Sequence, residues 1–155
     1  MRTLLALSIV VAMLACARPK TTPPPPPVTS ATPAPSAESM AVDTLRQANA
    51  RAASGQIDEA NRMYLSVIDA PNSAREALIA AAAGLYRTGD YADAVRGFAK
   101  LGPFAHGEED LRYYNAVSLY EVGRYADAKR ELACALPFIG VTPDVARYRA
   151  KIEAK

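Results

Sequence analysis

The chain has 155 residues and a net charge of +2, from 18 lysines and arginines and 16 aspartates and glutamates. Half of the residues are hydrophobic, which suffices for one modest domain. Acidic and basic residues balance from residue 40 onward and form no basic patch, so we expect no nucleic-acid partner.

The first residues have the pattern of an export signal. Arg2 precedes an apolar run over residues 4–15, which is shorter than the roughly 20 apolar residues that a membrane-spanning helix needs. The run ends at Cys16 and resembles the lipobox of bacterial lipoproteins, although Met13 stands where that motif usually has leucine. The resemblance implies a lipoprotein signal peptide at 1–15 and a lipid such as palmitate on Cys16.

Two features of the cysteines leave alternatives open. Ala15 and Ala17 flank Cys16 in the small-x-small pattern of ordinary signal cleavage, which would release a soluble protein. The other cysteine, Cys134, falls in a helical pattern and has no disulfide partner in the chain if Cys16 is acylated. We expect Cys134 to be a small, partly buried apolar residue without chemistry.

Residues 16–39 form a linker in this interpretation, with Cys16 at its start. Eight prolines occur in residues 17–39 and Val28 is the only large apolar side chain there, so this stretch cannot build a core. Proline-rich sequence favours extended polyproline II, which predicts a stiff tether between a membrane and a domain at 40–155. A PxxP docking motif is the alternative.

From residue 40 the sequence becomes rich in alanine and repeats at an interval of 34 residues. Glycines mark a turn in each repeat, and a proline follows each second helix and stops it. Apolar residues at spacings of three and four on both sides of each glycine predict two amphipathic helices per repeat. The repeats extend over about residues 41–71, 75–105 and 109–138; their glycines are Gly55, Gly89 and Gly123, and their prolines Pro71, Pro103 and Pro137.

A last helix is predicted over residues 143–154. Thr142 is suited to the N-cap and Pro143 to the first helical position. Val145, Tyr148 and Ile152 share one face, while charged residues dominate the rest. This pattern is typical of a terminal helix that caps a repeat stack.

The repeats resemble the tetratricopeptide repeat, a 34-residue helix–turn–helix unit. The matching residues are the three turn glycines, then Ile57, Tyr91 and Tyr125, the close-packing Ala60, Ala94 and Ala128, and the large Tyr64, Phe98 and Leu132. Alanine lets two helices approach closely, and the large residue four positions later fills the space beside the crossing. The aromatic residue that usually opens the first helix is missing. The resemblance implies an all-α solenoid of three units with a capping helix.

Catalysis has little support in this sequence. His106 is the only histidine and lies in a predicted loop without a nucleophile at motif spacing. The acidic residues 108–110 begin a predicted helix, where negative charge favours the N-terminal end of the helix dipole. We therefore expect no enzyme activity, no cofactor, no metal and no small-molecule substrate.

The resemblance also implies a partner-binding groove lined by the first helix of each repeat. Groove positions of the family that we select here are Leu45, Asn49, Ile79, Tyr86, Arg87, Tyr113, Val117 and Tyr120. Tyrosine is common at interface hot spots because it offers a large contact area at low entropic cost. As the alternative, Tyr113, Tyr114 and Tyr120 pack as ordinary core against Tyr86 or the capping helix.

The function expected from these features is that of an adaptor between proteins. Cys16 would hold the chain in the bacterial outer membrane facing the periplasm, since Ala17 rather than aspartate follows the lipidated cysteine. The repeats would dock a helix or extended segment of another envelope protein in pilus or secretion, gliding-motility or outer-membrane assembly. A soluble periplasmic chaperone or regulator, cleaved after Ala17, is the alternative.

Overall fold

A computed structural model describes residues 36–155, and this part of the chain is all-α. Its seven helices are α1 (Ala37–Ala53), α2 (Ile57–Asp69), α3 (Arg75–Thr88), α4 (Tyr91–Leu101), α5 (Glu109–Glu121), α6 (Tyr125–Ala135) and α7 (Pro143–Glu153). The predicted signal peptide, Cys16 and most of the predicted linker lie outside the described residues. The linker was predicted to end at residue 39, but α1 already begins at Ala37, with the Ser36 side chain as its N-cap.

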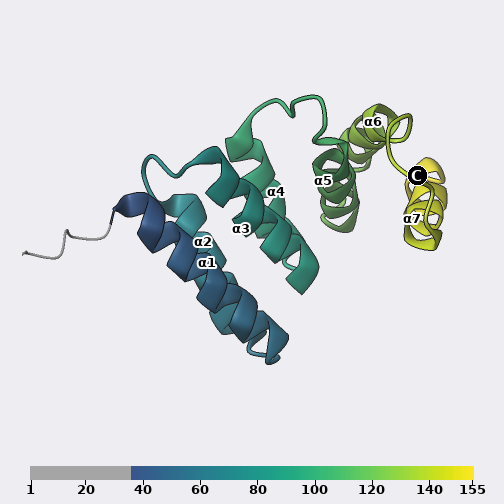
Figure 1. The fold of residues 1–155 in the computed structure, drawn as a ribbon. Helices are drawn as coiled ribbons and strands as arrows, with labels where there is room; N and C mark the ends of the chain where they lie inside the picture. The colour runs from purple at the N-terminus through teal and green to yellow at the C-terminus, as the bar shows by residue number, and fades with distance from the viewer. Residues whose placement is uncertain (1–35) are drawn as a thin grey trace, which may run out of the picture. The chain divides into compact units, whose positions relative to one another are not determined.

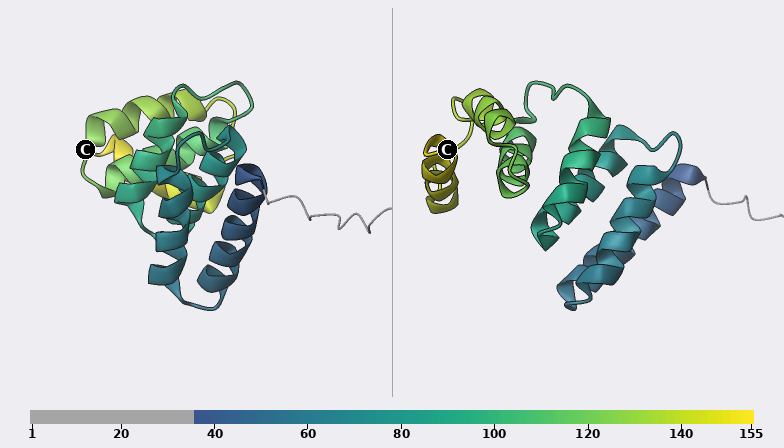
Figure 2. Two further views of the ribbon diagram at one scale, coloured as in Figure 1. Left: turned by 90° about the vertical axis from the view of Figure 1, so that its left-hand side faces the viewer. Right: turned by 180° about the vertical axis from the view of Figure 1, so that it is seen from behind.

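The helices pack as antiparallel pairs that follow one another in chain order (Figure 1). The pairs are α1 with α2, α3 with α4, and α5 with α6, and α7 packs against α6. Figure 2 shows the same pairing from the side and from behind. Successive pairs meet through α2 and α3 and through α4 and α5, while the first helices α1, α3 and α5 contact each other in turn. The predicted helix–turn–helix arrangement is confirmed.

The turn within each pair depends on its glycine. Gly55, Gly89 and Gly123 have φ angles of 80°, 82° and 82°, in the left-handed region that costs other residues energy. The second helix of each pair begins two residues later. The spacing of these glycines therefore sets the spacing of the pairs.

Equivalent residues of the three pairs are buried alike. Ala60, Ala94 and Ala128 are wholly inaccessible, and Tyr64, Phe98 and Leu132 are at most 2% exposed. Small residues thus lie at the helix crossings and large ones beside them, as the sequence predicts.

The helix ends also follow the predicted signals. The second helices end at Asp69, Leu101 and Ala135, each two residues before a proline. Thr142 caps α7 by accepting a 3.2 Å hydrogen bond from the Val145 amide, and Pro143 opens the helix. The predicted inner face of α7, formed by Val145, Tyr148 and Ile152, is buried.

The buried side chains form two apolar clusters, one within α1–α4 and one within α5–α7. Tyr86 from α3 and Tyr114 from α5 pack against both clusters. Their rings stack with centroids 4.5 Å apart and planes 19° from parallel. This stack joins the second helix pair to the third. Among residues 36–155, no helix combines the length and apolar character needed to cross a membrane.

Candidate functional site

The residues selected as a partner groove lie on α1, α3 and α5, whose shared surface we call the first-helix face. Leu45 and Asn49 come from α1; Ile79, Tyr86 and Arg87 from α3; Tyr113, Val117 and Tyr120 from α5. Because these three helices are neighbours in the fold, the structure does bring the selected residues onto adjacent helices. Their accessibility, however, differs between the two ends of the face.

On α1 and α3 the first-helix face is largely open. Asn49 and Arg87 are exposed and Ile79 is half-buried, whereas Leu45 is buried in the core of the first two pairs. The Asn49 side-chain oxygen accepts hydrogen bonds from the Tyr64 hydroxyl at 2.7 Å and from Arg87 Nη2 at 3.2 Å. These two hydrogen bonds hold the Asn49 side chain between α1 and α3. The other N–H groups of the exposed Arg87 guanidinium can still donate to a partner.

On α5 the selected residues are mostly core, which corrects the groove expected there. Val117 is wholly inaccessible and Tyr113 is 5% exposed, so neither presents a surface to a partner. Both belong to the cluster that contains Val145 and Tyr148 of α7. The physical reason is that the apolar sides of α5, α6 and α7 share one core, and Tyr113 also donates a hydrogen bond to Asp144 of α7.

The remaining tyrosines of this region also pack against neighbours. Tyr86 is half-buried, with its ring stacked on Tyr114 and edge-on to Tyr91 at a centroid distance of 6.2 Å. Tyr120 lies edge-on to Tyr148 at 6.3 Å and close to Tyr125 at 5.5 Å. Tyr113 is therefore a core residue, as the alternative interpretation expected. Tyr86 and Tyr120 are packed against neighbours but remain partly accessible.

Burial keeps the phenols of this region protonated. It raises the pKa of Tyr86 to about 12. It also raises the pKa of Tyr113, further helped by the hydrogen bond to Asp144, and that of Tyr148, helped by Glu121. At neutral pH these groups are neutral hydrogen-bond donors and do not act as bases or nucleophiles.

Packing of α5 tyrosines against the last helix was the alternative interpretation of the sequence, but the hydrogen bonds between α5 and α7 were not anticipated. Tyr113 donates to Asp144, and Tyr148 donates to Glu121, each at 2.9 Å. One signal for them exists: Tyr148 follows Tyr114 by 34 residues, so α7 continues the register of the first helices. A fourth first helix is expected to pack on α5 as α5 packs on α3.

Other candidate groups are simple surface residues. His106 is exposed and contacts Glu109 at 3.1 Å, near the ring of Phe138. Cys134 is exposed on α6, which corrects the expectation that it is partly buried. Within residues 36–155, no cluster of three histidine, cysteine or acidic side chains is arranged to hold a metal ion.

Comparison with known proteins does not assign the chain to a family. No protein-family model matches the chain, and neither a curated protein nor a solved structure is significantly similar to it.

Proposed function

We propose that the chain is a tetratricopeptide-repeat lipoprotein of the bacterial envelope that acts as an adaptor between proteins. The observation that carries the repeat assignment is the agreement of equivalent positions at the 34-residue interval. Turn glycines share one φ, crossing alanines share complete burial, and the large residue four positions later is always core. Such repeats serve mainly as binding scaffolds.

The binding surface that we propose is the open part of the first-helix face on α1 and α3. Ile79 and Tyr86 supply half-buried apolar contact area, and Arg87 and Asn49 supply exposed hydrogen-bonding groups. A helix or extended segment with an apolar stripe and a flanking acceptor for Arg87 fits this chemistry. Because Tyr113 and Val117 of α5 are buried, the partner would lie on the first two repeats.

The anchor that we propose is a lipid on Cys16, with the proline-rich residues between Cys16 and α1 as tether. In this proposal the repeats face the periplasm from the outer membrane and serve an assembly such as a pilus or secretion system, the gliding machinery or outer-membrane biogenesis. We propose a binding role rather than a catalytic one, with no cofactor and no nucleic acid. A soluble periplasmic chaperone or regulator remains the alternative.

Metabolic labelling with radioactive palmitate tests the anchor. We expect label in the wild-type chain and none in Cys16→Ala. Cys134→Ala is the matched control and should keep its label. Absence of label in the wild type would favour cleavage after Ala17 and the soluble alternative.

Site-specific photo-crosslinking in living cells tests the binding surface. A photoreactive residue at Ile79 should capture one envelope protein, whereas the same residue at the exposed Arg62 of α2 should not. Arg87→Ala should weaken the Ile79 capture at unchanged protein level. Equal capture from both positions would contradict the proposed surface.

A further inference from the structure

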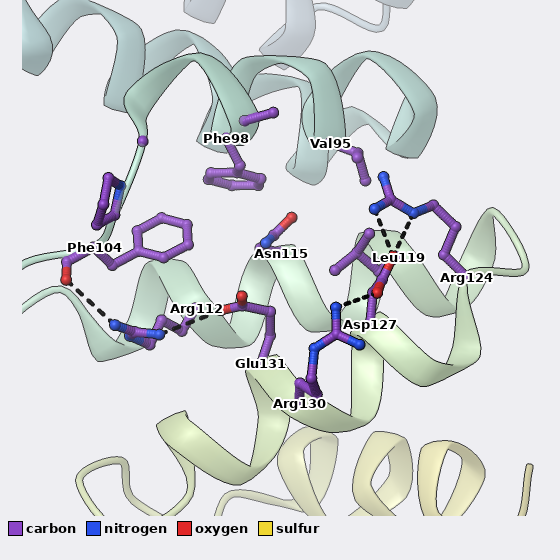
Figure 3. A pocket seen from close by; sticks show the side chains of 13 residues that line it. Val95, Phe98, Phe104, Arg112, Asn115, Leu119, Arg124, Asp127, Arg130 and Glu131 are labelled. Atoms are coloured by element: carbon purple, nitrogen blue, oxygen red, sulfur yellow. Dashed lines mark hydrogen bonds and ion pairs between the residues drawn. The ribbon is translucent and has the colours of Figure 1, made fainter.

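A crevice of about 450 Å³ lies on the side of the stack formed by α4 and α6 (Figure 3). One wall is α4 with the loop that follows it, and the other is formed by α5 and α6. Its polar lining consists of Arg112, Asn115, Arg124, Asp127, Arg130 and Glu131. Arg112 and Asn115 lie on α5, but none of these residues is among those selected for the partner groove, so the crevice is a separate feature of the molecule.

The crevice marks a difference between two equivalent junctions of the stack. We call the contact of α2 with α3 and α4 the first junction, and the contact of α4 with α5 and α6 the second junction. At the 34-residue interval, Leu78, Ala81 and Gly97 of the first junction correspond to Arg112, Asn115 and Glu131 of the second. Small and apolar residues are thus replaced by large polar ones.

Gly97 shows why the first junction is closed. A Cβ atom at this position would lie 2.8 Å from Ile68 Cδ1 and 2.9 Å from Ala82 Cβ, so α4 approaches α2 and α3 as closely as glycine permits. Glu131 cannot be accommodated at such a distance. The connection at the second junction is also longer, residues 102–108 against residues 70–74. The second junction therefore stays open.

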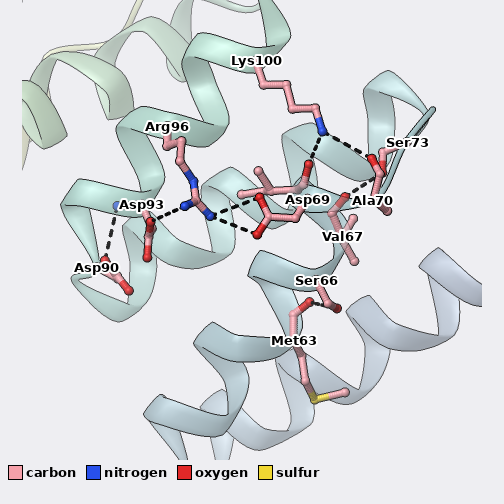
Figure 4. A network of polar contacts seen from close by, with 11 residues as sticks. Met63, Ser66, Val67, Asp69, Ala70, Ser73, Asp90, Asp93, Arg96 and Lys100 are labelled. Carbon is pink, nitrogen blue, oxygen red and sulfur yellow. Dashed lines mark hydrogen bonds and ion pairs between the residues drawn. The ribbon is translucent and has the colours of Figure 1, made fainter.

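Charged side chains bridge the first junction (Figure 4). Arg96 of α4 pairs with Asp93 in its own helix at 3.5 Å and reaches across to Asp69 of α2 at 3.2 Å. Lys100 of α4 donates to the backbone carbonyls of Ile68 and Ala70 at the end of α2. The Asp69 carboxylate thus pairs with Arg96, and two backbone carbonyls at the end of α2 accept hydrogen bonds from Lys100.

The equivalent bridge is missing at the second junction. Arg130 corresponds to Arg96 and pairs with Asp127 of its own helix at 2.5 Å, but the position of Asp69 is taken by Pro103. Lys100 corresponds to Cys134, which is not a cation. Among the described residues, Arg130 therefore has no carboxylate partner across the junction.

The charge of the crevice favours an anion. Arg112, Arg124 and Arg130 face only Asp127 and Glu131 in its lining, which leaves one positive charge in excess. Hydrogen bonds from Arg124 and then Arg130 lower the pKa of the Asp127 carboxyl, so this group is ionised and engaged at neutral pH. The Arg130 side chain is 72% exposed, and its guanidinium has donors beyond those turned toward Asp127.

We infer that the crevice binds an acidic side chain of a protein partner, which supplies to Arg130 the carboxylate that Asp69 supplies to Arg96. Phe104 and Val95 are half-buried in the crevice lining, so an apolar side chain next to the acidic one can pack beside it. The inference goes beyond the proposed function and does not depend on the proposed binding surface of α1 and α3, since the two surfaces share no residue.

Nuclear magnetic resonance titration of the isotope-labelled full chain in non-ionic detergent tests this inference. The probe is the blocked dipeptide acetyl-Phe-Asp-amide, and acetyl-Phe-Asn-amide is its uncharged match. We expect saturable shifts of the Arg124 and Arg130 Nε–H signals and of neighbouring α4 and α6 amides with the first probe. Binding of the second probe should be about fivefold weaker or less.

Variants decide whether Arg130 is responsible. Arg130→Gln should weaken binding of acetyl-Phe-Asp-amide by about fivefold or more, while Arg149→Gln, at an exposed α7 arginine, should leave it unchanged. The inference is overturned by equal binding of both dipeptides, by no effect of Arg130→Gln, or by no saturable shift. The same shifts with inorganic phosphate would mean an adventitious ion only. None of these outcomes changes the result expected from cross-linking at Ile79, so the two proposals are tested independently.

Discussion

The hydroxyl of Tyr113 in α5 donates a 2.9 Å hydrogen bond to a carboxylate oxygen of Asp144 in α7. A second bond of the same length runs in the opposite direction, from Tyr148 of α7 to Glu121 of α5. Tyr113 and Tyr148 are both buried, so the donor of each bond is shielded from water, while the acceptor Glu121 is exposed. Two phenol–carboxylate bonds and an apolar face thus attach the last helix to the stack.

Removal of the Tyr113 hydroxyl should weaken this attachment. We expect Tyr113→Phe to lower the free energy of unfolding by about 1 kcal/mol, because the bond is lost while Asp144 keeps its contact with Arg147. Urea denaturation measures the effect. Tyr125→Phe, at a more exposed phenol without a side-chain hydrogen bond in residues 36–155, is the control and should be neutral. Equal loss in both variants would contradict the prediction.

Alkaline pH should unfold the protein as the buried tyrosines ionise. The pKa of Tyr113, Tyr148 and Tyr86 is raised in the folded chain above the ordinary value of about 10. The folded state then holds these protons more tightly than the unfolded state, so this contribution to stability is complete below about pH 10 and is lost above it. Phenolate absorbance and helical circular dichroism, followed together, should change in one step for these groups. Ionisation of all tyrosines before any loss of helix would refute this.

A methyl group at Gly84 should be poorly tolerated. Its Cβ would lie 2.5 Å from the ring of Tyr64, which is 1% exposed and hydrogen-bonded to Asn49. Overpacking costs about 1–3 kcal/mol, which exceeds the gain of about 1 kcal/mol from replacing a helical glycine by alanine. We expect Gly84→Ala to lower the melting temperature. Gly140→Ala, where a Cβ meets nothing within 4 Å, is the control and should leave it unchanged.

Arg75 should stabilise the connection between α4 and α5. It donates to the Leu101 carbonyl at 2.8 Å and pairs with Glu108 at 2.6 Å. We expect Arg75→Met to lower the midpoint of urea denaturation modestly at neutral pH, because the pair is lost but is partly exposed to solvent. Arg149→Met, which loses an exposed pair with Glu153, should lower it less.

The cost of Arg75→Met should also depend on pH. The Arg75 hydrogen bond holds the pKa of Glu108 below its ordinary value of about 4.3. A lowered pKa in the folded state contributes stability above the unfolded pKa, and this contribution is lost as pH falls through the folded pKa. The difference between Arg75→Met and the wild type in urea denaturation should therefore shrink below about pH 4. A difference that does not change with pH would argue against the pair.

The sequence by itself determined the helices and the order in which they pair. The 34-residue interval of Gly55, Gly89 and Gly123 predicted the turns, the following prolines predicted the helix ends, and Thr142 predicted the cap of the last helix. These features are local, because backbone conformation and apolar spacing depend on residues within one or two helical turns.

Only the tertiary structure decided which neighbour covers each apolar face. Val117 and Tyr113 have the same spacing as groove residues in other repeats, but they are buried in the core that α5, α6 and α7 share. The sequence predicted a partly buried Cys134, but its side chain is exposed on α6. The crevice likewise depends on how closely each second helix approaches the helix pair before it. Gly97 lets α4 approach closely at the first junction, whereas the equivalent residue of α6 is Glu131, which lines the open crevice. Periodicity identifies the apolar side of a helix, but packing distances depend on residues far apart in the chain.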